Sequence, residues 1–377
     1  DLEMVLAEYR AEQEARLEAE RLIRLEEQRE VVKGLIPILT SIEACSFNMG
    51  SGQGMGYADE RPQHQVHIDY HFEVAQTQVT QALYEAVTGH NPSHFQGDKL
   101  ESGDDSHDRP VEQISWYDAL VFCNQLSDFS DLTPAYDLSG EHPKWINRSN
   151  GYRLPTEAEW ECFATSGEHT SYAGGENVDH VAWHGETAHG LTHSVAQLTP
   201  NSFGLYDCSG NVWEWCYDQW HPQAYKERGD EVFNPVTHHL EVAKGKPREH
   251  VARGGSWFGE SDQCRVSYRA SFAEDYTVST LGLPLVRGAA NLALSDQEES
   301  EEILTTPGFP QGDSVSPEEF APPELTIPAG DVTTPIKLAT PEQASQAPAS
   351  ADKESAERGE STSVVIESST EDAESDD

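Results

Sequence analysis

The chain has 377 residues, of which 67 are Asp or Glu and 24 are Lys or Arg, giving a formal net charge of −43. This length holds one large domain or two small ones. Basic residues are scarce throughout, so we expect no nucleic-acid partner, because binding to phosphates needs a basic face. Every apolar run is far shorter than the eighteen or so residues of a membrane helix, so no direct membrane insertion is expected in this chain.

Residues 1–36 predict a charged helical stalk or linker. The segment is dense in Glu, Arg, Ala and Leu, and pairs such as Glu12 and Arg16 have the i,i+4 spacing that stabilises a helix. Gly34 and Pro37 predict where the helix ends. Its apolar residues form only a broken heptad, so a weak dimer through this helix stays open as an alternative to a single helix.

The middle of the chain, residues 37–289, predicts one loop-rich α+β domain. It contains all eight tryptophans, with many Gly and Asn residues between short apolar runs. The chain lacks the regular alternation of strands and helices that a doubly wound sheet or a TIM barrel requires. Strands are expected over Gln65–Val74 and Val251–Arg253, and helices with Ser or Thr caps over Thr80–Thr88, Ser115–Gln125 and Thr156–Ala164.

Residues 290–377 predict a disordered acidic tail. The segment consists mainly of Glu, Asp, Ser, Thr, Pro and Ala, with almost no aromatic residue. Such a composition cannot bury enough apolar surface to offset the entropy lost on ordering.

Cysteines and histidines suggest no metal cluster. The six cysteines do not form a disulfide framework, and they lack the CxxC spacing of a zinc site. His64, His67 and His71 lie close in sequence, but alternation along a strand places His67 and His71 on one face with Asp69, and His64 on the other. No site with three ligands follows from that arrangement.

A series of ordered motifs runs from residue 47 to residue 287. The motif over Gly151–Glu161 contains a capping box, in which Thr156 precedes Glu159. The other motifs are Phe47–Gly50, Glu60–Pro62, Gln78–Thr80, Pro110–Val111, Ile114–Ala119, Pro200–Asp207, Gly210–Trp215 and Arg253–Trp257.

Together these motifs resemble the formylglycine-generating enzyme or sulfatase-modifying factor family, whose domain is a variant of the C-type lectin fold. The resemblance implies an irregular C-type lectin-like domain over residues 37–289. We expect the tryptophans of these motifs to be core scaffolding. Because one fold hosts several functions, activity must be argued from the site.

For active members, the resemblance implies a copper oxidase that converts a cysteine of a target sulfatase to formylglycine. Its two thiols are the second and seventh residues after the aromatic residue of the Gly-Gly-Ser-aromatic turn, which here are Gly259 and Cys264. A soft Cu(I) ion needs both thiolates, so we expect neither copper nor oxidase activity. No catalytic residue is assigned; an oxidase would use Cys264 and Ser256. A pairing of Cys216 with Cys264 is left open.

The resemblance also implies a structural calcium site. The family holds calcium with two side chains and two backbone carbonyls at spacing i, i+3, i+5 and i+7, and oxygen ligands suit this hard cation. The matching residues are Asp207, Gly210, Val212 and Glu214.

The leading hypothesis is therefore a non-catalytic, calcium-stabilised recognition module that binds a protein or a small ligand at the Phe258–Gln263 loop. Two alternatives are a formylglycine-generating oxidase working through Cys264 and a variable binding protein diversified by a retroelement. The candidate ligand-binding residues are Trp257, Phe258, Glu260, Ser261, Asp262 and Gln263, with Trp183 and His184 from an adjacent loop.

The compartment is not fixed by the sequence. The chain opens at Asp1 without Met, which suggests a processed or truncated product. We favour export over a cytoplasmic location, because calcium is abundant outside cells and a stalk suits an anchored protein.

Overall fold

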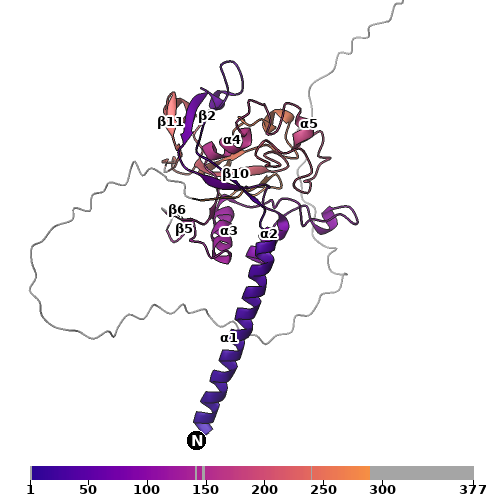
Figure 1. Ribbon diagram of the computed structural model, residues 1–377, viewed down its shortest axis with the longest axis vertical. Helices are drawn as coiled ribbons and strands as arrows, with labels where there is room; N and C mark the ends of the chain where they lie inside the picture. The colour runs from indigo at the N-terminus through magenta and orange to yellow at the C-terminus, as the bar shows by residue number, and fades with distance from the viewer. Residues whose placement is uncertain (1, 141, 147–148, 239, 289–377) are drawn as a thin grey trace, which may run out of the picture. The chain divides into compact units, whose positions relative to one another are not determined.

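The computed structural model describes residues 2–140, 142–146, 149–238 and 240–288 (Figure 1). The predicted tail over residues 290–377 lies outside this part. No described helix is long and apolar enough to cross a membrane. The described part combines helices with short strands, which confirms the predicted irregular α+β domain with an N-terminal helix.

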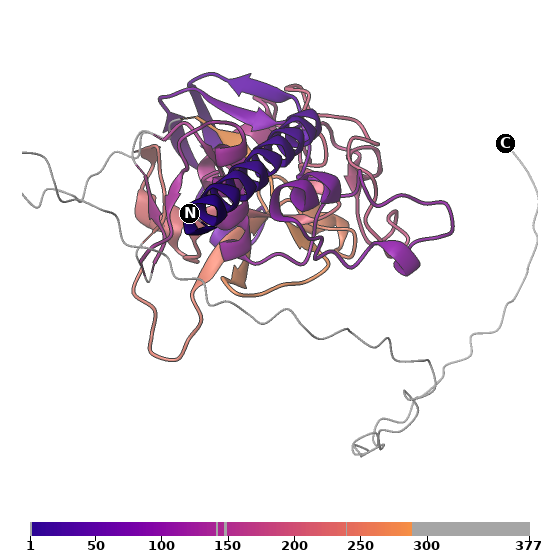
Figure 2. The same ribbon diagram turned by 90° about the horizontal axis from the view of Figure 1, so that it is seen from below.

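The N-terminal helix α1 spans Leu2–Leu35, close to the prediction. Most of its apolar side chains are exposed, and it contacts the rest of the domain through its C-terminal end, beside α2 (Figures 1 and 2). There Val32 is fully buried, the Gln28 amide donates to Ala86 O at 2.8 Å, and Arg29 pairs with Asp131 at 2.6 Å. The last two turns of α1 therefore pack as part of the domain.

The three predicted domain helices are confirmed, and each is capped as its sequence indicates. The Thr80 hydroxyl accepts from Leu83 N, while Ser115 and Thr156 each form a full capping box. The helices after α1 are α2 (Gln81–Thr88), α3 (Trp116–Phe129), α4 (Glu157–Thr165), α5 (Val178–Val181) and α6 (Ala224–Arg228), with 3-10 turns η1 (Ala58–Glu60), η2 (Gly97–Lys99) and η3 (Ser261–Cys264).

The strands form three small sheets and two strand pairs. One sheet has the order β1 (Leu39–Ile42), β4 (Phe72–Ala75), β15 (Val286–Arg287), β7 (Tyr152–Arg153). Another is β13 (Ala270–Ala273), β12 (Glu249–Arg253), β10 (Trp213–Gln219), β14 (Leu281–Gly282), and the third is β11 (Glu231–Phe233), β3 (His64–Ile68), β2 (Cys45–Met49). The pairs are β5 (Tyr136–Asp137) with β6 (Lys144–Trp145) and β8 (Ala182–Trp183) with β9 (Ser209–Gly210).

The expected strand over Gln65–Val74 is wrong as a single element. It is two strands, β3 and β4, that belong to different sheets. The chain breaks after Ile68, where Asp69 N donates to Asn234 Oδ1, so the alternation assumed for His67 and His71 does not run through. Among the described residues, no group of three His, Cys, Asp or Glu side chains is placed to hold a metal ion.

The core confirms the predicted role of the motif tryptophans. Trp116, Trp160, Trp213 and Trp215 are all buried, whereas Trp257 is only half-buried. Strand β10 is buried on both faces. It lies between β12 and β14 within its sheet, and Glu214 on it is buried against Trp160 of α4, whose indole N–H donates to the carboxylate at 2.6 Å.

One disulfide forms, Cys45 with Cys162, and it joins β2 to α4. The sequence did not predict this single bond, because the two residues are 117 positions apart and only the fold brings them together. The other four cysteines, Cys216 and Cys264 among them, are free and buried.

Candidate functional site

The turn after β12 holds Cys264 in a closed environment. Gly254 and Gly255 both have positive φ, and a Cβ on Gly255 would lie 2.7 Å from Cys264 Sγ. Only glycine permits this close approach. Cys264 is 0% exposed, and burial raises the pKa of its thiol to about 12. The thiolate needed for metal binding or nucleophilic attack is thus disfavoured.

Gly259 stands at the first of the two positions that carry a cysteine in active members, so the turn has only one thiol. Its N–H donates to Ser256 O at 3.1 Å, and its carbonyl accepts from Gly185 N at 2.8 Å. Ser256 is itself buried. A two-thiolate copper site does not fit these residues, since the single protonated thiol provides one poor ligand.

The predicted ligand loop is partly exposed and rests on aromatic rings. Phe258 is 74% exposed, and its ring meets that of Trp257, which in turn packs edge-on against Phe95. Glu260 is also exposed, while Ser261, Asp262 and Gln263 are half-buried. Asp262 accepts from Arg265 Nε at 2.7 Å.

The second predicted loop lies against the first. Trp257 N donates to Asn211 O, and Asn211 N donates to Trp183 O, so the backbone of one residue joins both loops. Trp183 is half-buried and stacks on His193, with 3.9 Å between ring centroids. His184 is buried, with Nε2 2.9 Å from Asp179, so it faces the interior and not the exposed surface proposed for it.

The four predicted calcium residues lie around one buried point, but Asp207 meets it with its backbone carbonyl, since its carboxylate accepts from Ala196 N at 2.8 Å. Gln78 Nε2 marks it, because this nitrogen lies 3.0 Å from Val212 O, 3.1 Å from Asp207 O and 3.5 Å from Gly210 O. Gln78 also donates to the carboxylate of Glu214. Its Oε1 is buried without a hydrogen-bond partner. A half-turn of the amide would aim this oxygen at the same point, and a cation bound there would be coordinated by the amide and carbonyl oxygens together.

Two buried carboxylates flank this point without a cationic side chain. Burial raises the pKa of Glu214 to about 8, although hydrogen bonds from Trp160 and Gln78 act to lower this pKa. Burial likewise raises the pKa of Asp207 to about 6, although hydrogen bonds from Ala196 and Asn211 act to lower it. Buried acids whose hydrogen-bond partners are all neutral favour either a bound proton or a cation. The set therefore fits calcium, with carboxylate, carbonyl and amide oxygens as ligands.

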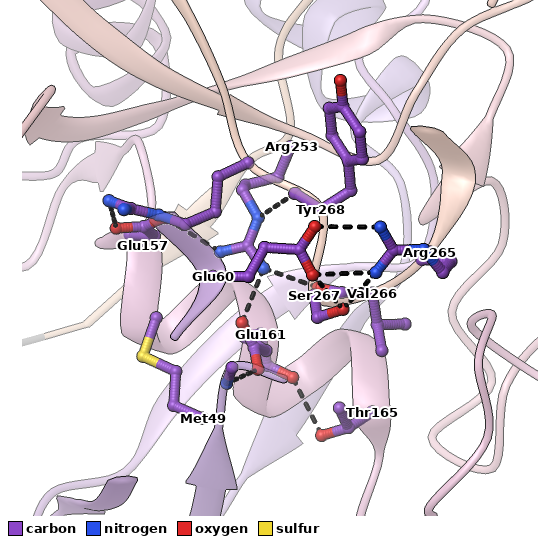
Figure 3. A network of polar contacts seen from close by, with 12 residues as sticks. Met49, Glu60, Glu157, Glu161, Thr165, Arg253, Arg265, Val266, Ser267 and Tyr268 are labelled. Atoms are coloured by element: carbon purple, nitrogen blue, oxygen red, sulfur yellow. Dashed lines mark hydrogen bonds and ion pairs between the residues drawn. The ribbon is translucent and has the colours of Figure 1, made fainter. Parts of the chain in front are cut away.

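A buried ionic network lies beneath the turn (Figure 3). Arg253 donates to Glu161 at 2.6 Å and to Glu157 at 3.1 Å, and its Nε donates to Tyr268 O. Arg269 binds both carboxylate oxygens of Glu157, one of which it shares with Arg253. Burial opposes ionisation of Glu157, but Arg269 and Arg253 hold its pKa down at about 2. This network fixes β12 and the segment after Cys264 to α4.

A further hollow was not predicted from the sequence. A cleft of about 1000 Å³ opens between β2, the loop after α4 and the residues after η3, and of the predicted ligand residues only Asp262 lines it. Gln78 was also missed as part of the calcium set, although it belongs to a quoted motif. The cleft has no contiguous signal, because its walls come from three distant segments.

Comparison with known proteins now identifies the family. The model of the sulfatase-modifying factor enzyme 1-like domain matches residues 26–289. The chain belongs to this family. The resemblance noted in the sequence is thereby confirmed, and the match begins within α1, whose last two turns pack on the domain.

Relatives of this family include proteins with different names. The chain is 32% identical over 251 residues to chaperone protein LppX of Paenibacillus barcinonensis, covering 57% of this chain and 80% of that protein. It is 31% identical over 191 residues to the formylglycine-generating enzyme of Streptomyces coelicolor, covering 46% of this chain. The chain spans about half of that enzyme, 51% of its length.

A solved structure shares the fold over most of its length. The Treponema denticola variable protein 1 is 32% identical to the chain, with a TM-score of 0.57, and the match covers 66% of this chain and 94% of that one. Members of the sulfatase-modifying factor enzyme 1-like family thus include enzymes as well as proteins named for other roles.

Proposed function

We propose that this chain is a non-catalytic recognition module, stabilised by calcium, that binds a protein or a small ligand at the Phe258–Gln263 loop. One observation carries the proposal: the turn that would hold a copper pair has a single, fully buried thiol, Cys264, with Gly259 in the other position. The exposed Phe258 ring beside this turn offers the contact surface that such a module needs.

Similarity to two proteins supports this reading. One relative is named a chaperone protein, and a chaperone acts by binding other proteins. The other is named a variable protein, which favours the alternative in which the loop is a diversified binding surface. Encoded relatives that differ from this chain only at positions near Phe258 would support that alternative.

Copper binding tests the absence of catalysis. We expect the wild-type chain to bind no stoichiometric Cu(I) in competition with a chelator, and to leave the mass of a Cys-x-Pro-x-Arg peptide unchanged when copper and oxygen are supplied. Gly259→Cys should gain Cu(I) binding, because it restores the second thiol. The substitution is tolerable: Gly259 has no positive φ, and an added Cβ meets only the flexible end of Gln263.

Ser139→Cys, which adds an exposed thiol after β5, is the matched control and should stay without tight copper binding. If the wild-type chain bound stoichiometric copper and the peptide lost mass, the alternative function, an oxidase working through Cys264, would replace the proposed recognition module.

A crosslinking experiment tests the ligand surface. A photoreactive phenylalanine analogue at Phe258 should give a discrete crosslinked product in an extract of the source cells, and Phe258→Ala in the competing unlabelled chain should abolish competition. Phe233 on β11 is the control, since it is 60% exposed but lies on another sheet. Equal products from both positions would refute the assignment of the surface.

A further inference from the structure

The cleft beside β2 gathers three primary amides on one of its sides. Asn48 of β2 and Gln65 of β3 lie directly opposite each other in their sheet, and both line the cleft with exposed side chains. Gln63, which comes just before β3 begins, also lines it and is exposed. The cleft thus covers the exposed face of these two strands. Its volume of about 1000 Å³ is at the upper end of the size of ligand pockets.

These amides retain hydrogen-bonding capacity that the protein does not use. Within the part of the chain that the structure describes, the side chains of Asn48 and Gln65 form no hydrogen bond. The Gln63 amide nitrogen donates to Gly50 O at 3.1 Å, which still leaves its oxygen to accept a bond. A primary amide has two donor hydrogens and one acceptor oxygen. A ligand that satisfies all three amides must therefore both donate and accept, as a hydroxyl group does.

The buried and half-buried charges of the lining are paired within the protein. Arg265 donates to both oxygens of Glu60 and to both oxygens of Asp262 (Figure 3 shows the Glu60 pair). Glu161 is bound by the guanidinium of Arg253 at 2.6 Å. A charged ligand would have to compete with these pairs, so they favour an uncharged ligand.

The rest of the lining distinguishes between uncharged ligands. Glu168 is exposed and accepts from the Ser202 hydroxyl, and this carboxylate and the net charge of −43 both disfavour an anion. Tyr57 and Met55 are 54% and 68% exposed, and they offer apolar surface to the C–H face of a sugar ring. A peptide would need several apolar or charged anchors, whereas most other lining residues are Ser, Thr, Asn, Gln or Gly.

We infer that this cleft binds a neutral oligosaccharide, whose hydroxyl groups form hydrogen bonds with the amides of Asn48, Gln65 and Gln63 while a sugar ring packs on Tyr57. Opposite residues of an antiparallel pair have Cβ atoms about 5 Å apart, so one sugar ring can reach both Asn48 and Gln65. Each sugar hydroxyl can accept from an amide N–H and donate to an amide oxygen. The inference does not depend on the Phe258 surface.

Native gel electrophoresis of the full chain tests the inference. Each gel contains one neutral polysaccharide, either dextran, galactomannan, xyloglucan, arabinoxylan or mixed-linkage β-glucan, and a further gel contains anionic polygalacturonate. We expect at least one neutral polymer to slow the chain, and short oligosaccharides cut from that polymer to restore its mobility. Polygalacturonate should not slow the chain, because like charges repel. Calorimetric titration with the competing oligosaccharide then gives the dissociation constant.

Variants separate this site from other surfaces. Asn48→Ala and Gln65→Ala should each weaken oligosaccharide binding about fivefold, the effect of one net hydrogen bond, and the double variant should weaken it more than tenfold. Both side chains are exposed, so the urea midpoint should stay unchanged. Gln125→Ala, which removes an exposed amide on α3 outside the cleft, is the matched control and should bind like wild type. Phe258→Ala should also leave this affinity unchanged, which distinguishes failure here from failure of the proposed loop surface.

Three results would overturn the inference. One is unchanged mobility of the chain in every gel with a neutral polysaccharide, and another is oligosaccharide binding that the double variant retains in full. The third is tighter binding of a neutral peptide, acetyl-Thr-Val-Thr-Val-Thr-amide, than of the oligosaccharide, with loss of peptide affinity in the double variant. That result would assign the cleft to a peptide.

Discussion

Replacing Arg253 by Met should lower the free energy of unfolding by about 3–5 kcal/mol. Arg253 is completely buried, and its guanidinium binds Glu161, Glu157 and the carbonyl of Tyr268. Glu157 keeps Arg269 in the variant, but Glu161 loses its cationic partner. An uncompensated buried carboxylate is costly, so urea unfolding should show a midpoint at much lower urea concentration.

Arg287→Met is the matched control for that measurement. Arg287 pairs with Glu73, but about a third of each side chain is exposed, so the loss should stay below about 1 kcal/mol. Adding Glu161→Leu to Arg253→Met should recover part of the stability, because it removes the buried charge. Equal losses in Arg253→Met and Arg287→Met would contradict the central role of the buried network.

Without calcium, the chain should lose stability as pH rises from about 5 to about 8. Burial raises the pKa of Glu214 to about 8 and that of Asp207 to about 6, so the folded state keeps protons that the unfolded chain releases above its ordinary carboxyl pKa. This contribution is complete below the unfolded pKa and disappears as pH passes the folded pKa. The loss should be on the order of 3 kcal/mol in denaturant unfolding with a chelator present.

Calcium should abolish most of that fall, since the cation replaces the protons between the carboxylates. Asp218, whose pKa burial also raises to about 6, contributes equally with and without calcium, so the difference between the two curves reports the proposed site. Glu214→Gln should remove the calcium effect and the retained calcium measured by mass spectrometry. Glu85→Gln, an exposed acid on α2, should keep both. A wild-type pH curve unchanged by calcium would refute the calcium site.

Local signals in the sequence were enough for the helices but not for the sheets. The Thr80, Ser115 and Thr156 caps lie within three residues of the backbone groups they bind, so short motifs determine where α2, α3 and α4 begin. The break between β3 and β4 depends instead on Asn234, which is 165 residues from Asp69. Pairings at that distance leave no periodic pattern in one sequence.

Prediction of the candidate site likewise succeeded for residues close in sequence and failed for distant contacts. The resemblance located Glu214 and the carbonyls of Gly210 and Val212, which lie around Gln78, and Asp207 joins them through its backbone carbonyl. It did not locate Gln78, because this residue is 129 positions or more from the carbonyls that it contacts. It also placed His184 on the exposed surface, whereas this side chain is buried in the folded chain. Burial of a single side chain in an irregular domain is decided by packing that a lone sequence does not display.

The attachment of α1 through its final turns gives the domain a lever arm. From Met4 to Gln28 the helix extends about 36 Å at the ordinary rise per residue, while Val32 and the Arg29–Asp131 pair hold its other end against α2 and α3. A small tilt at that hinge becomes a large displacement at the far end. A pair of spin labels, one near Met4 and one on α2, would therefore read small movements of the domain as large changes in distance.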